Sequence, residues 1–252
     1  MSNPLSVGII AEGPTDHIMI HEIIQNLMRG KRDVIFHSIQ PEMSAAFAQI
    51  QGPTGTGWSG VFRRIELILQ WGPFQITNFL LSSLDLDVLI VHLDGDVSRE
   101  SYEEGHLAHI TLNNLPCNQI CCPLGKEQWT KPCDKNCIAP RQRIDQLRHV
   151  LLGWMHLNER VNDIVLCTPQ DASDTWVLAA LFPDNKFVQQ KKLECQQSPA
   201  NILSSTYHIN KNVRDYRNKV QGKLNEKWDN ARKNISEAER FSKEFLAGIR
   251  SR

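Results

Sequence analysis

The chain has 252 residues, of which 41% are hydrophobic, and its 28 basic and 28 acidic side chains give a formal net charge of zero. This length and apolar content suffice for one large domain, or for one domain with additions. The charge balance argues against a large nonspecific cationic surface, although local basic patches can still attract nucleic acid. No apolar run reaches the length of a membrane span and the first residues lack a signal-peptide pattern, so we expect a cytoplasmic protein without membrane association.

The first predicted element is a buried strand from Leu5 to Ala11. Glu12 follows this strand directly, and an apolar-periodic stretch up to Met28 then predicts a helix that Asp16 or its neighbour Thr15 could cap. A second strand is predicted over residues 33–40, stopped by a proline. Glu12 therefore stands at the carboxyl end of a strand, where open α/β sheets place their sites.

The most informative stretch is Asp94-Gly95-Asp96, which follows a short β-branched run from Val88 to Leu93. Such a run is typical of a strand buried on both faces in a parallel sheet. Gly95 allows a sharp turn, so that the two carboxylates can face one point, and oxygen ligands of this kind suit a hard cation such as Mg²⁺. The alternative is a surface turn that has this composition for conformational reasons only.

Five of the seven cysteines fall between residues 117 and 137, with the spacing Cys-x3-Cys-Cys-x10-Cys-x3-Cys. Two close pairs around a short loop resemble a structural zinc site, whereas disulfides are rare in cytoplasmic proteins. Reduced, buried cysteines are the remaining alternative. The favoured Zn²⁺ ligands are Cys117, Cys121, Cys133 and Cys137, with Cys122 as a spare.

An amphipathic helix is predicted over residues 141–157, and a further buried strand begins at Ile164. Asp171 and Asp174 begin the helix that follows this strand. Carboxylates at that position suit the helix dipole, so capping is one interpretation of both residues. The other interpretation makes Asp174 a fourth acid of the site.

Beyond Pro183 the chain becomes basic, with 15 Lys and Arg against seven Asp and Glu from Lys186 onward. Helices are predicted over residues 212–220 and 225–245. Their basic side chains could follow the phosphates of a nucleic acid, or could form a solvated helix face. The candidate phosphate contacts are Lys211, Arg214, Arg217 and Lys223.

Three motifs together resemble the Toprim domain of bacterial-type primases, type IA and type II topoisomerases and OLD-family nucleases. They are Glu-Gly-Pro-Thr-Asp at residues 12–16, Asp-Gly-Asp at residues 94–96 and Asp-Thr-Trp-Val-Leu-Ala at residues 174–179. The last motif is similar to the Glu-Thr-Trp-Leu-Leu-Ala segment of a Toprim-like family often found beside ATPases in bacterial defence gene clusters. Asp174 stands where that family has glutamate.

The resemblance implies a mostly parallel α/β sheet flanked by helices over residues 1–183. Cysteine spacing and charge add to this a Cys-rich insertion at about 99–140 and a helical basic extension over 184–252. It implies that Glu12, Asp94 and Asp96 bind Mg²⁺ or Mn²⁺, with Glu12 as ligand or general base and Asp174 as a further catalytic acid. The function expected is a metal-dependent nuclease acting on DNA or RNA, as the effector of an anti-phage defence system with a partner ATPase.

The alternative hypothesis belongs to a different functional class: a non-catalytic Toprim-like subunit that regulates an ATPase complex. No Walker motif lies in the chain, so any ATP dependence would come from a partner. The oligomeric state stays open, with a homodimer as one alternative.

Overall fold

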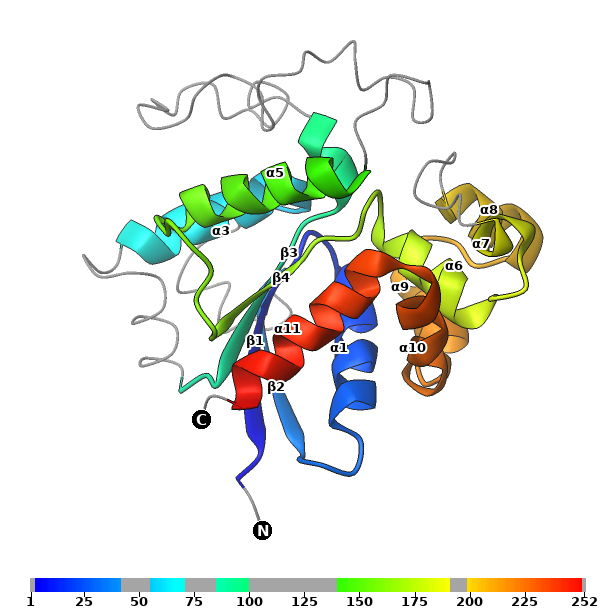
Figure 1. Cartoon of the computed structure of the whole chain (residues 1–252), viewed down its shortest axis with the longest axis horizontal. Helices are drawn as coiled ribbons and strands as arrows, with labels where there is room; N and C mark the ends of the chain where they lie inside the picture. Colours follow the sequence, from blue (N-terminus) through cyan, green and yellow to red (C-terminus); the bar gives the residue numbers. More distant parts are fainter. Residues whose placement is uncertain (1–2, 42–54, 71–84, 100–139, 191–198, 251–252) are drawn as a thin grey trace.

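Four parallel strands form a single sheet in the order β2-β1-β3-β4. The computed structural model describes residues 3–41, 55–70, 85–99, 140–190 and 199–250 (Figure 1). The strands are β1 (Leu5–Ile10), β2 (Val34–Gln40), β3 (Val88–His92) and β4 (Ile164–Cys167). The predicted parallel α/β architecture is confirmed, with β1 and β3 as the two central strands.

Alternate residues of the central strands face opposite sides of the sheet, as the two-residue period of a strand requires. In β3, Val88 and Ile90 belong to one apolar core, whereas Leu89 and Val91 belong to the other. All five residues of β3 are buried. This double burial explains why β3 is a continuous apolar run rather than an alternating pattern.

Helices cover both faces of the sheet (Figure 1). One face carries α3 (Gly57–Gln70) and α5 (Pro140–Trp154). The opposite face carries α1 (Pro14–Met28), α6 (Ser173–Leu181), α10 (Lys223–Asn234) and α11 (Ser236–Arg250). The shorter elements are the 3₁₀ turn η1 (Gly95–Arg99), α7 (Lys186–Gln189), α8 (Pro199–Tyr207), α9 (Val213–Asp215) and the π-helical turn η4 (Tyr216–Val220).

The last two helices share their core with the sheet. Trp228 of α10 and Phe241 of α11 lie 5.4 and 5.7 Å, centroid to centroid, from the ring of Trp176 in α6. All three rings are buried, and such aromatic pairs contribute about 1 kcal/mol each beyond the area they bury. Helices α10 and α11 are thus packed into the same hydrophobic core as β1, β3 and β4.

A buried arginine also fixes α11 to the sheet. The Arg148 guanidinium of α5 donates to the carbonyl oxygen of Leu166 in β4 at 3.0 Å, and to both carboxylate oxygens of Glu244 in α11 at 2.8 and 2.6 Å. This side chain therefore joins three elements that lie far apart in the sequence.

The predicted zinc ligands Cys117, Cys121, Cys133 and Cys137 lie outside the described residues, so the zinc site stays a prediction. Among the helices that the structure describes, none has the length and apolar character needed to cross a membrane.

Candidate metal centre

Glu12 and Asp94 meet at the carboxyl edge of the sheet. β1 and β3 are neighbouring parallel strands, with Ile10 opposite Val91, so the residues that follow them emerge side by side. Glu12 Oε1 accepts a hydrogen bond from the backbone N–H of Asp94 at 2.6 Å. This is the convergence expected from the sequence for these two acids.

Gly95 serves packing here rather than a left-handed turn. Its φ is not positive, and a Cβ at this position would overlap the carbonyl oxygen of Gln170 in the loop that follows β4. The backbone N–H of Asp96 then donates to the carbonyl of Asp171 at 2.9 Å. The glycine thereby lets the end of β3 approach the end of β4 closely enough for Asp94 to reach α6.

His92 completes a set of ligand atoms that sequence reasoning missed. One potential ligand atom from each of Glu12, His92 and Asp94 lies within 4.8 Å of the others. The imidazole is fully buried, and its Nε2 lies 3.3 Å from Asp94 Oδ1. Neither ring nitrogen has a partner in hydrogen-bond geometry among the described residues, which is unusual for a buried polar side chain.

A signal for His92 was present in the sequence. It is the polar last residue of an otherwise apolar strand and precedes Asp94 by two positions, so both side chains leave the chain on the same side. Its contacts with the other acids could not be read from that spacing.

Asp16 also belongs to this centre, although the sequence suggested a cap. The N-cap of α1 is Gly13, without a side-chain hydrogen bond, and Asp16 is buried in the first turn. Its Oδ1 accepts a hydrogen bond from Ser173 Oγ at 2.6 Å, while the Ser173 backbone N–H donates to Asp94 Oδ1 at 2.8 Å. Ser173 at the start of α6 therefore holds two acids from two other elements.

Asp174 is placed in the centre and makes no capping hydrogen bond. The N-cap of α6 is Ala172 and has no side-chain hydrogen bond. The buried Asp174 carboxylate accepts a hydrogen bond from Tyr216 Oη at 2.5 Å. Its other oxygen lies 3.3 Å from the ammonium of Lys211.

The four predicted phosphate contacts lie in two different environments. Lys211 turns into the acidic centre, where its Nζ also lies 3.3 Å from Asp94 Oδ2. Arg214 of α9, Arg217 of η4 and Lys223 at the start of α10 are exposed.

Asp96 lies at the margin of the centre. Its side chain is exposed at the start of η1 and is not in the group of ligand atoms formed by Glu12, His92 and Asp94. It is close enough to Glu12 for its charge to raise the pKa of that carboxyl. Of the three predicted metal ligands, the structure thus brings two into direct contact and leaves the third at the rim.

The acidic side chains of the centre outnumber its cationic side chains, and this excess of negative charge affects their pKa values. Burial, with the charges of Asp94 and Asp16, raises the pKa of Glu12 well above its usual range. Burial also raises the pKa of Asp16. For Asp94 the effect of burial is outweighed by His92 and Lys211, and its pKa is lowered. The pKa of His92 is raised, because Asp16 and Asp94 together outweigh the effect of its burial.

A cavity of about 510 Å³ opens over these acids. Glu12, Asp16, Asp94 and Lys211 line it, together with Thr56 and Gly57 at the start of α3 and Asn212 and Val213 at the start of α9. The Gly57 backbone N–H donates to the Glu12 carbonyl at 2.8 Å, which positions the α3 side of the cavity. The acids are therefore accessible to a ligand from solvent.

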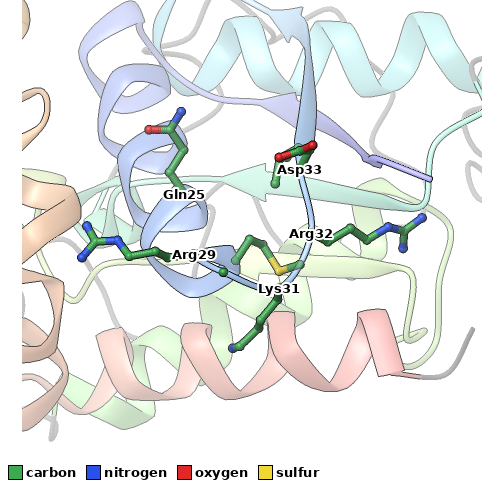
Figure 2. A pocket seen from close by; sticks show the side chains of 8 residues that line it. Gln25, Arg29, Lys31, Arg32 and Asp33 are labelled. Carbon is green, nitrogen blue, oxygen red and sulfur yellow. The ribbon is translucent and has the colours of Figure 1, made fainter. Parts of the chain in front are cut away.

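A second hollow of about 610 Å³ lies where α1 ends and β2 begins, at the amino edge of the sheet. Its cationic side chains Arg29, Lys31 and Arg32 point away from one another (Figure 2). Each already binds an oxygen acceptor, namely those of Asn225, Leu27 and Asn3 respectively. This hollow therefore lacks the convergent polar groups of a ligand site.

Comparison of the chain with family models, curated proteins and solved structures finds no significant match.

Proposed function

We propose that this protein is a divalent-metal-dependent nuclease, in which the centre at Glu12, His92 and Asp94 supports hydrolysis of a phosphodiester bond. The observation that carries the proposal is the close approach of these three ligand atoms at the carboxyl edge of a parallel sheet, beneath an open cavity. Parallel α/β sheets hold their ligands at this edge. The Toprim-like motifs at residues 12–16, 94–96 and 174–179 point to the same chemistry.

The residues present fit a divalent cation. The fully buried imidazole of His92 faces the carboxylates of Glu12 and Asp94, and its Nε2 lies 3.3 Å from Asp94 Oδ1 outside hydrogen-bond geometry, so these side chains offer a set of ligand atoms to a cation. Carboxylate oxygens suit Mg²⁺ and Mn²⁺, and an imidazole nitrogen favours the transition metal of the two. Such a cation, when bound, polarises the scissile phosphate and lowers the pKa of a bound water.

The other roles in the proposed hydrolysis fall to residues of the chain itself. Glu12 is less buried than Asp94 and lines the cavity, so it could serve as a metal ligand or accept a proton from an attacking water. Asp94 and Asp16 are held in place by Ser173. The exposed side chains of Arg214, Arg217 and Lys223 could attract a polyanion that uncompensated carboxylates would repel.

The substrate class in this proposal is nucleic acid, either DNA or RNA, and a separate ATPase is the proposed partner in anti-phage defence. This part rests on the Toprim-like motifs and on the lack of a Walker motif in the chain. One observation favours the alternative of a non-catalytic regulatory subunit: Lys211 already supplies a positive charge to Asp94 and Asp174.

An assay of Asp94→Asn on single- and double-stranded DNA and RNA, with Mg²⁺ or Mn²⁺, tests the proposal. Loss of a ligand should lower the cleavage rate by roughly a hundredfold or more. Asp229→Asn is the matched control, because Asp229 is 67% exposed and contacts only Arg232 among the described residues. Equal activity of the two variants, or no cleavage by the parent protein with or without a partner ATPase, would favour the regulatory subunit.

A further inference from the structure

The ammonium of Lys211 stands inside the acidic centre. Its Nζ is 3.3 Å from Asp94 Oδ2 and 3.3 Å from Asp174 Oδ2. These carboxylates follow different strands, β3 and β4, and Lys211 comes from the segment between α8 and α9. A single side chain thus bridges two acids that are otherwise held apart by separate elements.

The oxygen of Asp94 that Lys211 contacts has no other hydrogen-bond donor among the described residues. Asp94 Oδ1 already accepts the Ser173 N–H at 2.8 Å and lies 3.3 Å from His92 Nε2. Oδ2 has fewer partners than Oδ1, and it is the oxygen that faces Lys211. An incoming cation and the ammonium would therefore compete for the same atom, and two positive charges at that distance repel.

We propose that Lys211 is a tethered counter-cation that neutralises the metal-free centre and is displaced from Asp94 when a divalent ion binds. The proposal rests on the metal centre described above and adds a regulatory step to it. Loading of the centre then includes breaking the Lys211–Asp94 ion pair, so the metal affinity is lower than that of the same ligands without the lysine. The displaced ammonium stays at the cavity wall, which Lys211 lines together with Asn212 and Val213.

The surroundings of Lys211 allow such a movement. Its side chain is 39% exposed, whereas those of Asp94 and Asp174 are 7% and 2% exposed. Residues 208–212 form no helix or strand, so the lysine is not fixed by a regular element. The acids, in contrast, keep their positions without it, since Ser173 holds Asp94 and Tyr216 holds Asp174.

Metal titration of Lys211→Met provides the first test. Methionine retains an unbranched, flexible side chain of similar shape and removes the charge. Calorimetric titration with Mn²⁺ should show binding tighter by about tenfold than in the parent protein, equivalent to about 1.4 kcal/mol. Lys219→Met is the matched control, because Lys219 is 40% exposed and pairs with Asp215 outside the centre. Lys219 also donates to the His208 carbonyl, so this variant reports on disturbance of the same segment.

Amine labelling of the parent protein provides the second test and does not depend on a variant. An N-hydroxysuccinimide ester reacts with free amines, and peptide mass spectrometry resolves the modification of Lys211 from that of Lys219. Saturating Mn²⁺ should increase labelling of Lys211 several-fold and leave that of Lys219 unchanged. This measurement reports on Lys211 in the unsubstituted protein, and Lys219 controls for a general change in amine reactivity when the metal is added.

The results expected if displacement is wrong differ from those expected if the metal centre itself is absent. Tighter binding in Lys211→Met together with metal-dependent labelling supports displacement. Equal or weaker binding by the variant, or unchanged labelling of Lys211 at saturating metal, overturns displacement while leaving the metal centre in place. Absence of Mn²⁺ binding by both the parent and the variant overturns the metal centre and the displacement together.

Discussion

The backbone N–H of Asp94 donates its hydrogen bond to the side chain of Glu12 and not to another backbone carbonyl. The Glu12 carboxylate therefore closes the gap between the ends of β1 and β3 while also presenting charge to the cavity. One residue thus serves both the fold and the centre, and its two contributions can be separated by substitution.

Glu12→Gln should stabilise the protein in the presence of a chelator. The amide oxygen can still accept the Asp94 N–H, while the repulsion from Asp94 and Asp16 that helps to raise the pKa of Glu12 is removed. Because this pKa is raised on folding, the parent loses stability as pH rises from about 4.5 toward the folded-state pKa, and the variant should lack this decline. Urea denaturation with EDTA between pH 5 and 8 measures the difference.

Glu12→Ala is the comparison for that experiment, because alanine removes the charge and the acceptor together. Leaving the Asp94 N–H without a partner costs about 1–3 kcal/mol, so the alanine variant should be less stable than the glutamine variant. A glutamine variant that is less stable than the parent in EDTA would contradict the electrostatic interpretation.

His17 should make the protein sensitive to mild acid. It is buried in α1, and burial, together with His21, lowers its pKa from 6.5 to about 4. Between these two pH values His17 is protonated in the unfolded chain and neutral in the folded chain. Its contribution to the free energy of unfolding is therefore fully present above pH 6.5 and is lost as the pH falls toward 4. The loss amounts to about 3 kcal/mol by proton linkage.

The difference between the parent and His17→Leu isolates this effect, since contributions from the acidic centre cancel. Denaturant midpoints measured from pH 4 to 7.5 should fall more steeply in the parent than in the variant. His21→Gln removes the smaller of the two causes of the lowered His17 pKa, so its slope should lie between those of the parent and of His17→Leu. Parallel curves for the parent and His17→Leu would exclude the assignment.

Tyr216→Phe should destabilise the protein by about 1–3 kcal/mol. The phenol is buried and donates to Asp174 Oδ1 at 2.5 Å, so its removal leaves a buried carboxylate oxygen without that donor. A double-mutant cycle with Asp174→Asn, followed by chemical denaturation, measures the coupling. A coupling energy near zero would mean that the phenol does not hold this acid.

Arg148→Met should cost about 1–3 kcal/mol, because it removes the two hydrogen bonds that Arg148 donates to Glu244 and leaves Arg240, at 3.2 Å, as the remaining guanidinium partner of that carboxylate. The control is Arg232→Met, whose partners Asp229 and Glu239 are 67% and 30% exposed, so that each lost pair should cost less than about 1 kcal/mol. Thermal unfolding of both variants gives the comparison. Similar losses in the two would show that α11 does not depend on this buried ion pair.

The strands β3 and β4 could be predicted because each is a short, fully buried apolar run, and because burial on both faces of a parallel sheet demands that composition. The positions of Glu12 and Asp94 followed from their place after such strands. Lys211 could not be found in this way, since it lies 117 residues from Asp94 and its charge suggested solvent or phosphate. The position of Asp16 could not be predicted for a related reason. A carboxylate in the first turn of a helix is explained by capping alone, and the sequence gives no sign of its tertiary contact with Ser173.

The order of the elements along the chain has a consequence for biosynthesis. Trp228, Phe241 and Phe245 fill the core against which α1, α6 and the sheet pack, and Lys211 and Tyr216 contact the acids from the same late part of the chain. While a ribosome has released only β1 to α6, the carboxylates of Glu12, Asp94 and Asp174 have neither their buried surroundings nor these partners. The centre therefore acquires its buried surroundings only after residues up to Phe245 have been translated.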